Sequence, residues 1–305
     1  MGVGGASNVA FESFAEDARP LRKPPWIRSG VPSGGAVREL RGLLRDLDLH
    51  TVCESANCPN LAECWSHHTA TLMLLGDVCT RSCGFCSVNT GRPGALDAHE
   101  PERVADAACR MRLRHVVITS VNRDDLPDGG AAVFAETIHA TRRRLPDCTV
   151  EVLVPDFHGN WDALQRVTDA APDVLNHNVE TVPRLYSRVR PQAKFERSLE
   201  ALQRSKEAGL VTKSGFMLGL GEEAPEVAQL MAELSAISVN ILTIGQYLQP
   251  TAAHLPVHAY ATPAEFDHFA EVGHSMGFDH VESGPFVRSS YHAWDHARRV
   301  LTPNA

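Results

Sequence analysis

The stretch Cys79-Thr-Arg-Ser-Cys83-Gly-Phe-Cys86 organises this sequence of 305 residues. It follows the apolar run 71–75 and precedes the turn-rich segment 87–94. Three thiols at positions i, i+4 and i+7 of a loop can converge on one metal centre, and in a four-iron cluster they would leave one iron open to a ligand. A structural zinc loop is the alternative. It would need a fourth ligand at short spacing, and no Cys or His lies in residues 87–98.

The bulk composition is that of a globular enzyme rather than of a nucleic-acid or membrane protein. Hydrophobic residues make up 43% of the chain, and the net charge of −8 argues against a general binder of nucleic acid or anionic membranes. No apolar run approaches the roughly 20 residues of a membrane span. The N-terminus lacks the basic region and long apolar core of a secretory signal. We therefore expect a cytoplasmic protein with no nucleic-acid or membrane partner.

Another cysteine triplet precedes Cys79, Cys83 and Cys86 in the chain, so we call it the first triplet and those three the second. The first triplet has the spacing C-x4-C-x5-C. It consists of Cys53, Cys58 and Cys64, so six of the eight cysteines lie within residues 53–86. Zinc sites favour two-residue gaps, and a reducing compartment disfavours a disulfide framework. The pattern therefore predicts a second iron–sulfur cluster whose fourth ligand comes from elsewhere. His67 and His68 are the local candidates for that ligand.

The remaining chain alternates short β-branched runs with longer helical patterns, which is typical of repeated β–α units around a parallel sheet. Residues 37–49 have Leu and Val at helical spacing and should precede this unit as an amphipathic helix. The expected strands are 70–75, 115–120, 149–154, 174–179, 211–218 and 239–247, and the expected helices between them are 101–111, 131–145, 161–171, 195–208 and 223–237. Six units are fewer than the eight of a closed TIM barrel. The predicted fold is α/β: a partial (β/α)6 TIM-type barrel with an N-terminal cluster-binding extension and a C-terminal capping segment.

The pattern of motifs and predicted strands divides the chain into four regions. Residues 1–20 are predicted to be disordered, and residues 21–68 form an N-terminal extension that carries the first triplet. Residues 69–250 form the barrel, and residues 251–305 form a C-terminal segment that closes the site.

Each predicted strand ends in polar or glycine residues. Because active sites of such barrels lie at the carboxyl ends of the strands, the site is expected at that rim.

The motifs together resemble those of the lipoyl synthase family. C-x3-C-x2-C with Phe85 before the last cysteine is similar to the signature of the radical S-adenosylmethionine (SAM) superfamily. The narrower family pattern adds C-x4-C-x5-C before it and a C-terminal R-S-S-Y, which matches residues 288–291. The stretches 120–130, 175–181 and 245–250 are also family-like, and the resemblance covers roughly residues 20–295.

The resemblance implies a sulfurtransferase with two four-iron clusters. The cluster on Cys79, Cys83 and Cys86 would bind SAM and reduce it to a radical that takes hydrogen from C6 and C8 of an octanoyl chain on a carrier lysine. The auxiliary cluster on the first triplet, capped by a serine, would donate sulfur. Ser290 is the expected cap, and Ser289 remains an alternative. The residues expected to contact SAM are Phe85, Asn122, Glu180, Arg190, Met217, Gly219 and Gln246.

The implied partners are an octanoylated lipoyl carrier domain, such as a 2-oxoacid dehydrogenase E2 subunit or the glycine cleavage H protein, an electron donor such as ferredoxin or flavodoxin, and cluster-assembly proteins. Two other functions share part of the pattern. An enzyme similar to biotin synthase would have the SAM loop but would lack the C-x4-C-x5-C triplet. A ferredoxin-type electron carrier would have clusters ligated fully by thiolates, and neither the barrel rhythm nor two cysteine triplets fits it.

Overall fold

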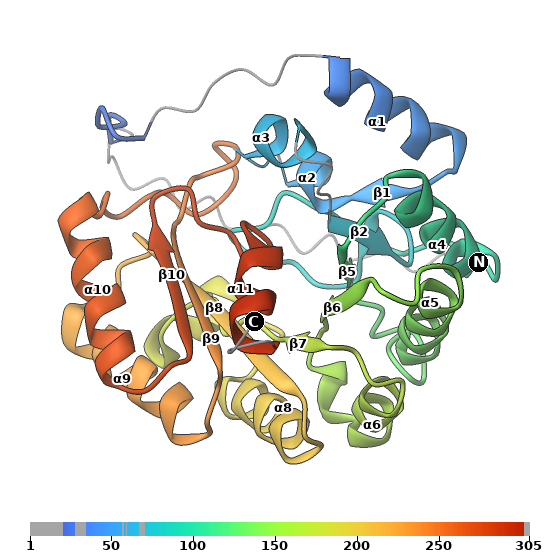
Figure 1. Ribbon diagram of the computed structural model, residues 1–305. Coiled ribbons are helices and arrows are strands. Elements are labelled where there is room, and N and C mark those ends of the chain that lie inside the picture. The colour runs from blue at the N-terminus through green and yellow to red at the C-terminus, as the bar shows by residue number, and fades with distance from the viewer. Residues whose placement is uncertain (1–20, 28–34, 57, 59, 67–70, 302–305) are drawn as a thin grey trace, which may run out of the picture.

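The computed structural model describes residues 21–27, 35–56, 58, 60–66 and 71–301. The described chain is an α/β structure built on one curved sheet with the strand order β1-β2-β5-β6-β7-β8-β9-β10 (Figure 1). Residues 1–20, which the sequence predicts to be disordered, lie outside the described residues, as do His67 and His68.

All six predicted strands are present and pair in parallel in chain order. They are β2 (Thr71–Leu74), β5 (His115–Ser120), β6 (Thr149–Leu153), β7 (Val174–Asn176), β8 (Val211–Leu218) and β9 (Ile241–Gln246). Two further strands extend the sheet. β1 (His50–Thr51) pairs antiparallel with β2, and β10 (His280–Gly284) pairs parallel with β9. The partial barrel is confirmed, and its seventh parallel strand comes from the C-terminal segment.

Helices cover the outside of the curved sheet, as Figure 1 shows. They are α4 (Glu100–Arg110), α5 (Ala131–Arg144), α6 (Trp161–Asp169), α8 (Phe195–Glu207), α9 (Ala224–Ala236) and α10 (Pro263–Ser275). The first five agree with the predicted helices. Helix α10 is an addition, and it begins with a capping box in which Thr262 and Glu265 satisfy each other's backbone N–H groups.

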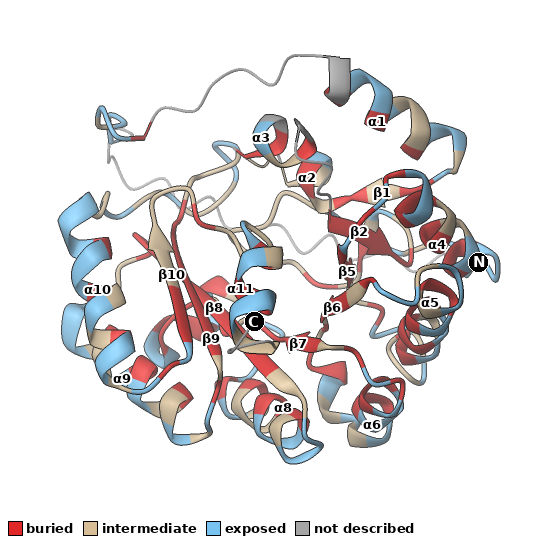
Figure 2. Ribbon diagram, in the orientation of Figure 1, coloured by how far each residue is buried: buried red, intermediate tan, exposed pale blue. Residues whose placement is uncertain are grey.

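The strands are buried on both faces, which explains their continuous apolar sequence. Val116 and Ile118 of β5 and Val150 and Val152 of β6 are fully buried. Burial of each such side chain stabilises the fold by roughly 1.5–3 kcal/mol. Figure 2 shows the same division in space, with buried residues along the strands and exposed residues on the outer faces of the helices. Of the described helices, none is both long and apolar enough to cross a membrane.

The two ends of the chain meet the barrel at different places. Helices α1 (Gly35–Asp46), α2 (Val52–Ser55) and α3 (Leu61–Ser66) lie along the β1–β2 edge, and α1 ends where Asp48 adopts a φ of 49°. Helix α11 (Ala293–Leu301) lies within the ring of strands in the view of Figure 1. It packs on the start of β5, because the ring of Trp294 contacts His115 and lies under the Arg114 guanidinium.

Candidate active site

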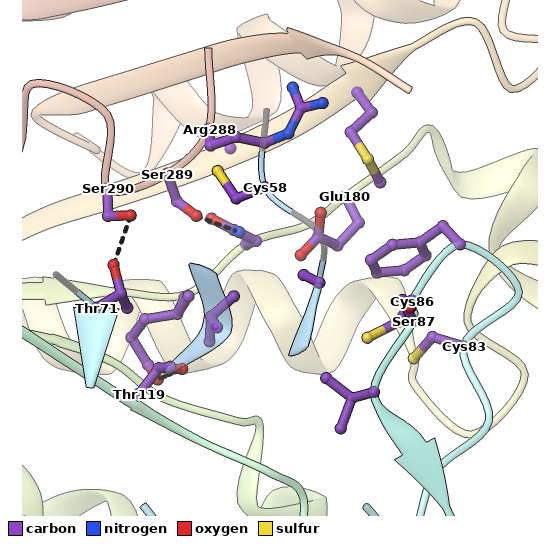
Figure 3. Close-up of a pocket in the computed structure, with 18 of the residues that line it drawn as sticks. Cys58, Thr71, Cys83, Cys86, Ser87, Thr119, Glu180, Arg288, Ser289 and Ser290 are labelled. Carbon is purple, nitrogen blue, oxygen red and sulfur yellow. Dashed lines mark hydrogen bonds between the residues drawn. The ribbon is translucent and has the colours of Figure 1, made fainter. Parts of the chain in front are cut away.

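A cavity of about 540 Å³ lies inside the barrel. It is within the range of small-molecule sites, which is about 300–1,000 Å³. Thiols from both triplets line it together with the serine pair of the C-terminal segment: Cys53, Cys58, Cys79, Cys83, Cys86, Ser289 and Ser290. The two serines lie more than 200 positions after the cysteines in the sequence, and only the fold brings them to one space (Figure 3).

The second triplet sits on a loop that begins with the short strand β3 (Val78–Cys79), which pairs with β4 (Asn89–Thr90). Cys79 is buried, and its Sγ accepts hydrogen bonds from the backbone N–H of Asn122 (3.3 Å) and of Arg81 (3.4 Å). The next cysteine is followed by Gly84. A Cβ at that position would come within 2.8 Å of the Leu255 side chain. The loop is therefore tightly packed at its glycine and held by sulfur–amide contacts at its start.

Arg81 is a buried cation that fixes this loop to the ends of two strands. Its guanidinium donates Nε and Nη2 to the two carboxylate oxygens of Asp124 at 2.6 and 2.7 Å, and Nη2 lies 2.7 Å from Asp156 Oδ1. Arg197 Nε donates to the other oxygen of Asp156 at 2.6 Å. Bidentate arginine–carboxylate pairs combine strength with a defined orientation. Sequence reasoning did not single out Arg81, although its place between two cluster cysteines was the available signal.

The thiols of this loop are crowded together with carboxylates and cations. The pKa of Cys83 is raised to about 11 and the pKa of Cys86 to about 12, chiefly by burial and in addition by Glu180 and the neighbouring cysteines. Arg190 acts in the opposite direction on Cys83. Thiols with such a raised pKa stay protonated at neutral pH unless a metal cation binds them, because metal binding displaces the protons of its ligands. The donor set therefore fits an iron–sulfur cluster.

The first triplet is built on two short helices. Cys53 lies in α2, Cys58 follows it, and Cys64 lies in α3. The pKa of Cys53 is raised to about 11 and the pKa of Cys64 to about 12, chiefly by burial and in addition by other cysteines of the triplet. Three neighbouring thiols in a buried place, whose thiolate forms would repel one another without a cation, also fit a cluster. Cys64 is close to the other two, although it is not among the cavity-lining residues.

The segment after β10 connects this triplet to the barrel. Asn60 Nδ2 donates to the carbonyl of Phe286 at 2.6 Å, and the Tyr291 hydroxyl donates to Glu63 at 3.1 Å. Between these two contacts lie both serines. Ser290 Oγ accepts a 2.7 Å hydrogen bond from Thr71, and Ser289 Oγ accepts a 3.2 Å hydrogen bond from Asn178. In Figure 3, Ser290 and Thr71 lie on one side, Cys83 and Cys86 on the other, and Glu180 between them.

Five buried polar atoms of residues that line the cavity have no hydrogen-bond partner among the described residues. They are Ser120 Oγ, Asn122 Oδ1, Asn176 Oδ1, Asn178 Oδ1 and Arg190 Nε. Unpaired buried polar atoms cost free energy and are rare in folded proteins, so they indicate a polar ligand. Arg190 is held in place from one side, since its Nη1 donates to the Asn178 carbonyl at 2.8 Å. The remaining edge of its guanidinium is suited to a carboxylate.

Glu180 holds an unusual backbone conformation at the centre of the cavity. Its φ is 67°, a left-handed value that is uncommon for residues other than Gly and is found at functional sites. Its N–H donates to Gly215 and its carbonyl accepts from Met217, so β8 fixes it. Burial raises the pKa of the carboxyl, while the positive charges of Arg190 and Arg288 lower it. Phe85, Asn122, Arg190 and Met217 also line the cavity, and their contact with SAM stays a prediction.

Two predicted SAM contacts are not on the cavity wall. The fully buried side chain of Gln246 joins β8 to the segment 259–261: its Nε2 lies 3.0 Å from the carbonyls of Leu218 and Ala259, and its Oε1 accepts from Ala261 at 2.9 Å. Gly219 has a φ of 100°, and a Cβ there would collide with Gln246 Nε2 and the Ala259 carbonyl. The structure thus gives both residues a packing role at the strand end.

Comparison with known proteins shows the family of this chain. Residues 73–234 match the model of the radical SAM superfamily, and residues 10–58 match the N-terminal domain of lipoyl synthase of the radical SAM family. The chain is 61% identical to lipoyl synthase of Rubrobacter xylanophilus over 92% of this chain and 88% of the relative. It is 56% identical to lipoyl synthase of Chloroflexus aggregans over 94% of each.

Solved structures share the fold at low sequence identity. The Streptococcus suis protein SuiB bound to its precursor peptide SuiA gives a TM-score of 0.54 at 12% identity, covering 74% of this chain and 52% of that one. Methylornithine synthase gives a TM-score of 0.51 at 13% identity, covering 81% of both chains. The structural matches support the fold, and the near-full-length relatives decide the family. The chain belongs to the lipoyl synthase family of radical SAM enzymes.

Proposed function

We propose that this chain converts a protein-bound octanoyl-lysine into lipoyl-lysine by replacing one hydrogen at C6 and one at C8 with sulfur. The observation that carries the proposal is that a single cavity is lined by thiols of both triplets and by Ser290. When bound, one cluster with SAM would supply a radical able to take hydrogen from an unactivated carbon, and the other would supply sulfide. Side chains alone cannot perform this chemistry. Both centres must therefore open on the same space.

The residues of the loop at 79–86 hold the SAM side of the cavity. Cys79, Cys83 and Cys86 supply three thiolates, and the Arg81 pairing with two strand-end carboxylates keeps the loop in register with β5 and β6. The free edge of the Arg190 guanidinium would take the carboxylate of SAM. Glu180 and the unpaired oxygen of Asn122 suit its ammonium group and ribose hydroxyls. Phe85 and Met217 would form an apolar surface of the cavity against the adenine of SAM.

The C-terminal segment supplies the fourth ligand of the auxiliary site in this proposal. Ser290 Oγ lies against Thr71, and the Thr71 backbone is itself close to the Cys53 thiol. Ser289 Oγ is instead bonded to Asn178, beyond the end of β7. This difference in direction favours Ser290 over Ser289. The guanidinium of Arg288 interacts with the charges of both Cys58 and Glu180, so it would offset negative charge between the two halves of the cavity.

The macromolecular substrate in this proposal is an octanoylated lipoyl carrier domain, either a 2-oxoacid dehydrogenase E2 subunit or the glycine cleavage H protein. A low-potential donor such as ferredoxin or flavodoxin would provide electrons. Cluster-assembly proteins would rebuild the auxiliary cluster, and the reaction would take place in the cytoplasm. Family membership supports an octanoylated carrier, because a lipoyl synthase requires one.

The proposal is tested by incubating the reconstituted protein with SAM, dithionite and an octanoyl-lysyl peptide. The peptide should gain the mass of two sulfurs less two hydrogens, and 5′-deoxyadenosine should accumulate. Alanine at Cys79, Cys83 and Cys86 should leave about four irons per chain, the content of one four-iron cluster, and abolish 5′-deoxyadenosine. If the unmodified protein were only an electron carrier, it would produce no 5′-deoxyadenosine. SAM cleavage by the triple variant would contradict the assignment of the two loops.

A further inference from the structure

A group of histidines surrounds one carboxylate on the C-terminal segment, away from the cavity-lining residues. His280 and Glu282 are two positions apart on β10, so their side chains leave the same face of the strand. His292 directly precedes α11 and has a φ of 52°, and the N–H of His296 donates to its carbonyl. Ring nitrogens of both histidines lie within 4 Å of the Glu282 carboxylate. The turn after β10 brings the two pairs together.

The distances within this group are short. His280 Nε2 and His296 Nε2 each lie 3.2 Å from Glu282 Oε2, and the ring centroids of the two histidines are 4.5 Å apart. One ligand atom from each of these three residues lies within 4.8 Å of the others. His292 Nδ1 lies 3.6 Å from the second oxygen, Glu282 Oε1.

We propose that His280, Glu282 and His296 form a binding site for a divalent transition metal, with zinc as the best match. Zinc binds imidazole nitrogen and carboxylate oxygen at about 2.0–2.2 Å in tetrahedral geometry, which separates the ligand atoms by about 3.3 Å. The two nitrogen–oxygen distances match that separation. His280 and Glu282 of the strand face His296 of the helix, and this arrangement places three donor groups close together.

The surroundings allow a metal ion to enter and leave room for a fourth ligand. His280 and His296 are buried, Glu282 is half-buried, and the His292 side chain is 46% exposed. His292 therefore stands on the solvent side, where it or a water would complete the tetrahedron. Arg299 Nη1 lies 3.4 Å from His280 Nδ1, which is the ring nitrogen that faces away from Glu282. Arg299 is exposed and long, so it can turn into solvent.

The site would join β10 to α11 at the two ends of the segment 285–291. That segment contains Ser290, so the metal would restrict the part of the chain that carries the proposed cluster ligand. This consequence rests on the proposed function, whereas the metal site does not. A His–Glu–His cluster held by hydrogen bonds alone would have similar distances. A metal site differs from it in that the protein retains a metal ion with nitrogen and oxygen ligands.

The test uses the holoprotein with both clusters assembled, so that the thiols are occupied. It is treated anaerobically with equimolar zinc chloride and desalted, and then zinc and iron are measured and the zinc K-edge X-ray absorption is recorded. We expect about one zinc per chain, unchanged iron, and a shell of nitrogen and oxygen at about 2.0–2.1 Å with no sulfur at about 2.3 Å. Absence of retained zinc, or a sulfur shell, would overturn the site.

Variants then assign the ligands. Glu282→Gln and His296→Gln should each lose at least nine-tenths of the retained zinc, while His274→Gln, an exposed histidine near the end of α10, should keep it. Iron content and melting temperature report whether each variant is folded. If the buried variants do not fold, the absorption spectrum of the unmodified protein decides the question alone. Zinc retained at the unmodified level by a folded Glu282→Gln would overturn the proposal.

Discussion

Thr71 Oγ1 donates a 2.7 Å hydrogen bond to Ser290 Oγ, joining two residues that are 219 positions apart in the sequence. Thr71 opens β2 and is 4% exposed, and both residues line the cavity. A hydroxyl that donates to a second oxygen directs that oxygen's lone pairs and favours its deprotonated form. Thr71 thus positions the serine that we propose as the fourth ligand of the auxiliary cluster.

Replacement of Thr71 by Val should loosen the auxiliary cluster. The change removes the donor with little change in volume, and the loss of a buried hydrogen bond costs about 1 kcal/mol of folding free energy. We expect faster removal of about half of the iron by a chelator, with SAM cleavage intact. Thr71→Ser keeps the hydroxyl and should behave like the unmodified chain. Equal chelation rates in Val and Ser variants would contradict this role.

Replacement of Ser290 by Ala should leave SAM cleavage intact and remove sulfur transfer. Ser290→Cys should retain the auxiliary cluster more tightly, because thiolate is the softer iron ligand. The matched control is Ser289→Ala, which loses only the hydrogen bond to Asn178. Mass spectrometry of the octanoyl peptide and iron analysis report the two effects. Full insertion of two sulfurs by Ser290→Ala would rule out Ser290 as a required ligand.

Replacement of Arg81 by Lys should destabilise the SAM-cluster loop although it keeps the charge. Lys cannot pair with both oxygens of Asp124 and also reach Asp156, which is fully buried. Disruption of a buried ion pair costs about 3–5 kcal/mol when a charge is left unpaired, and Arg197 retains part of that pairing here. We expect a lower melting temperature and loss of iron from this site. Arg184→Lys, on an exposed pair with Glu226, is the control and should change neither property.

Glu151 and Lys213 form a buried pair whose contribution depends on pH. Lys213 Nζ donates to Glu151 Oε1 at 2.9 Å, and both side chains are at most 1% exposed. Burial raises the pKa of Glu151, but Lys213 and His115 lower it more, to about 2 from an ordinary 4.5. Because the folded value is the lower one, the stabilisation is complete above pH 4.5 and is lost as the pH falls toward 2.

Glu151→Gln should therefore cost about 3–5 kcal/mol of folding free energy at neutral pH, because it leaves Lys213 buried without its counterion. Glu151→Gln with Lys213→Met removes both charges and should recover much of that loss. Urea unfolding of each chain between pH 3 and 7 provides the measurement. The unmodified chain should lose stability toward acid more steeply than the double variant. A parallel pH dependence of the two would show that the pair does not control it.

Much of the fold is local information in the sequence. The runs at 115–120 and 149–154 are apolar enough to be recognised as strands covered on both faces, and the structure has them within a residue. The two cysteine triplets are likewise recognisable from spacing alone, because the three cysteines of each triplet lie within 12 positions of one another. These features depend on neighbours within about ten positions, which is why periodicity and spacing predict them.

The relations across the barrel were decided by tertiary structure. The residues at 280–284 include one apolar side chain and are not among the six predicted strands, and only pairing with β9 makes them the seventh parallel strand of the sheet. Gln246 ends a strand and was predicted to contact SAM. In the structure its side-chain amide donates hydrogen bonds to the carbonyls of Leu218 and Ala259. A polar residue at a strand end can face the cavity or the packing beneath a loop. The path of the loop, which composition does not encode, determines which of the two it does.

The serine pair shows the same division most sharply. The sequence by itself determined that Arg288-Ser289-Ser290-Tyr291 is a dense polar motif after an apolar strand, and that the first triplet needs a ligand from elsewhere. Which hydroxyl points toward which partner was decided only by the tertiary structure. In an irregular segment no repeating geometry sets the side-chain direction. Thr71 of β2 and Asn178 beyond β7, two residues far away in the chain, hold the two hydroxyls in place.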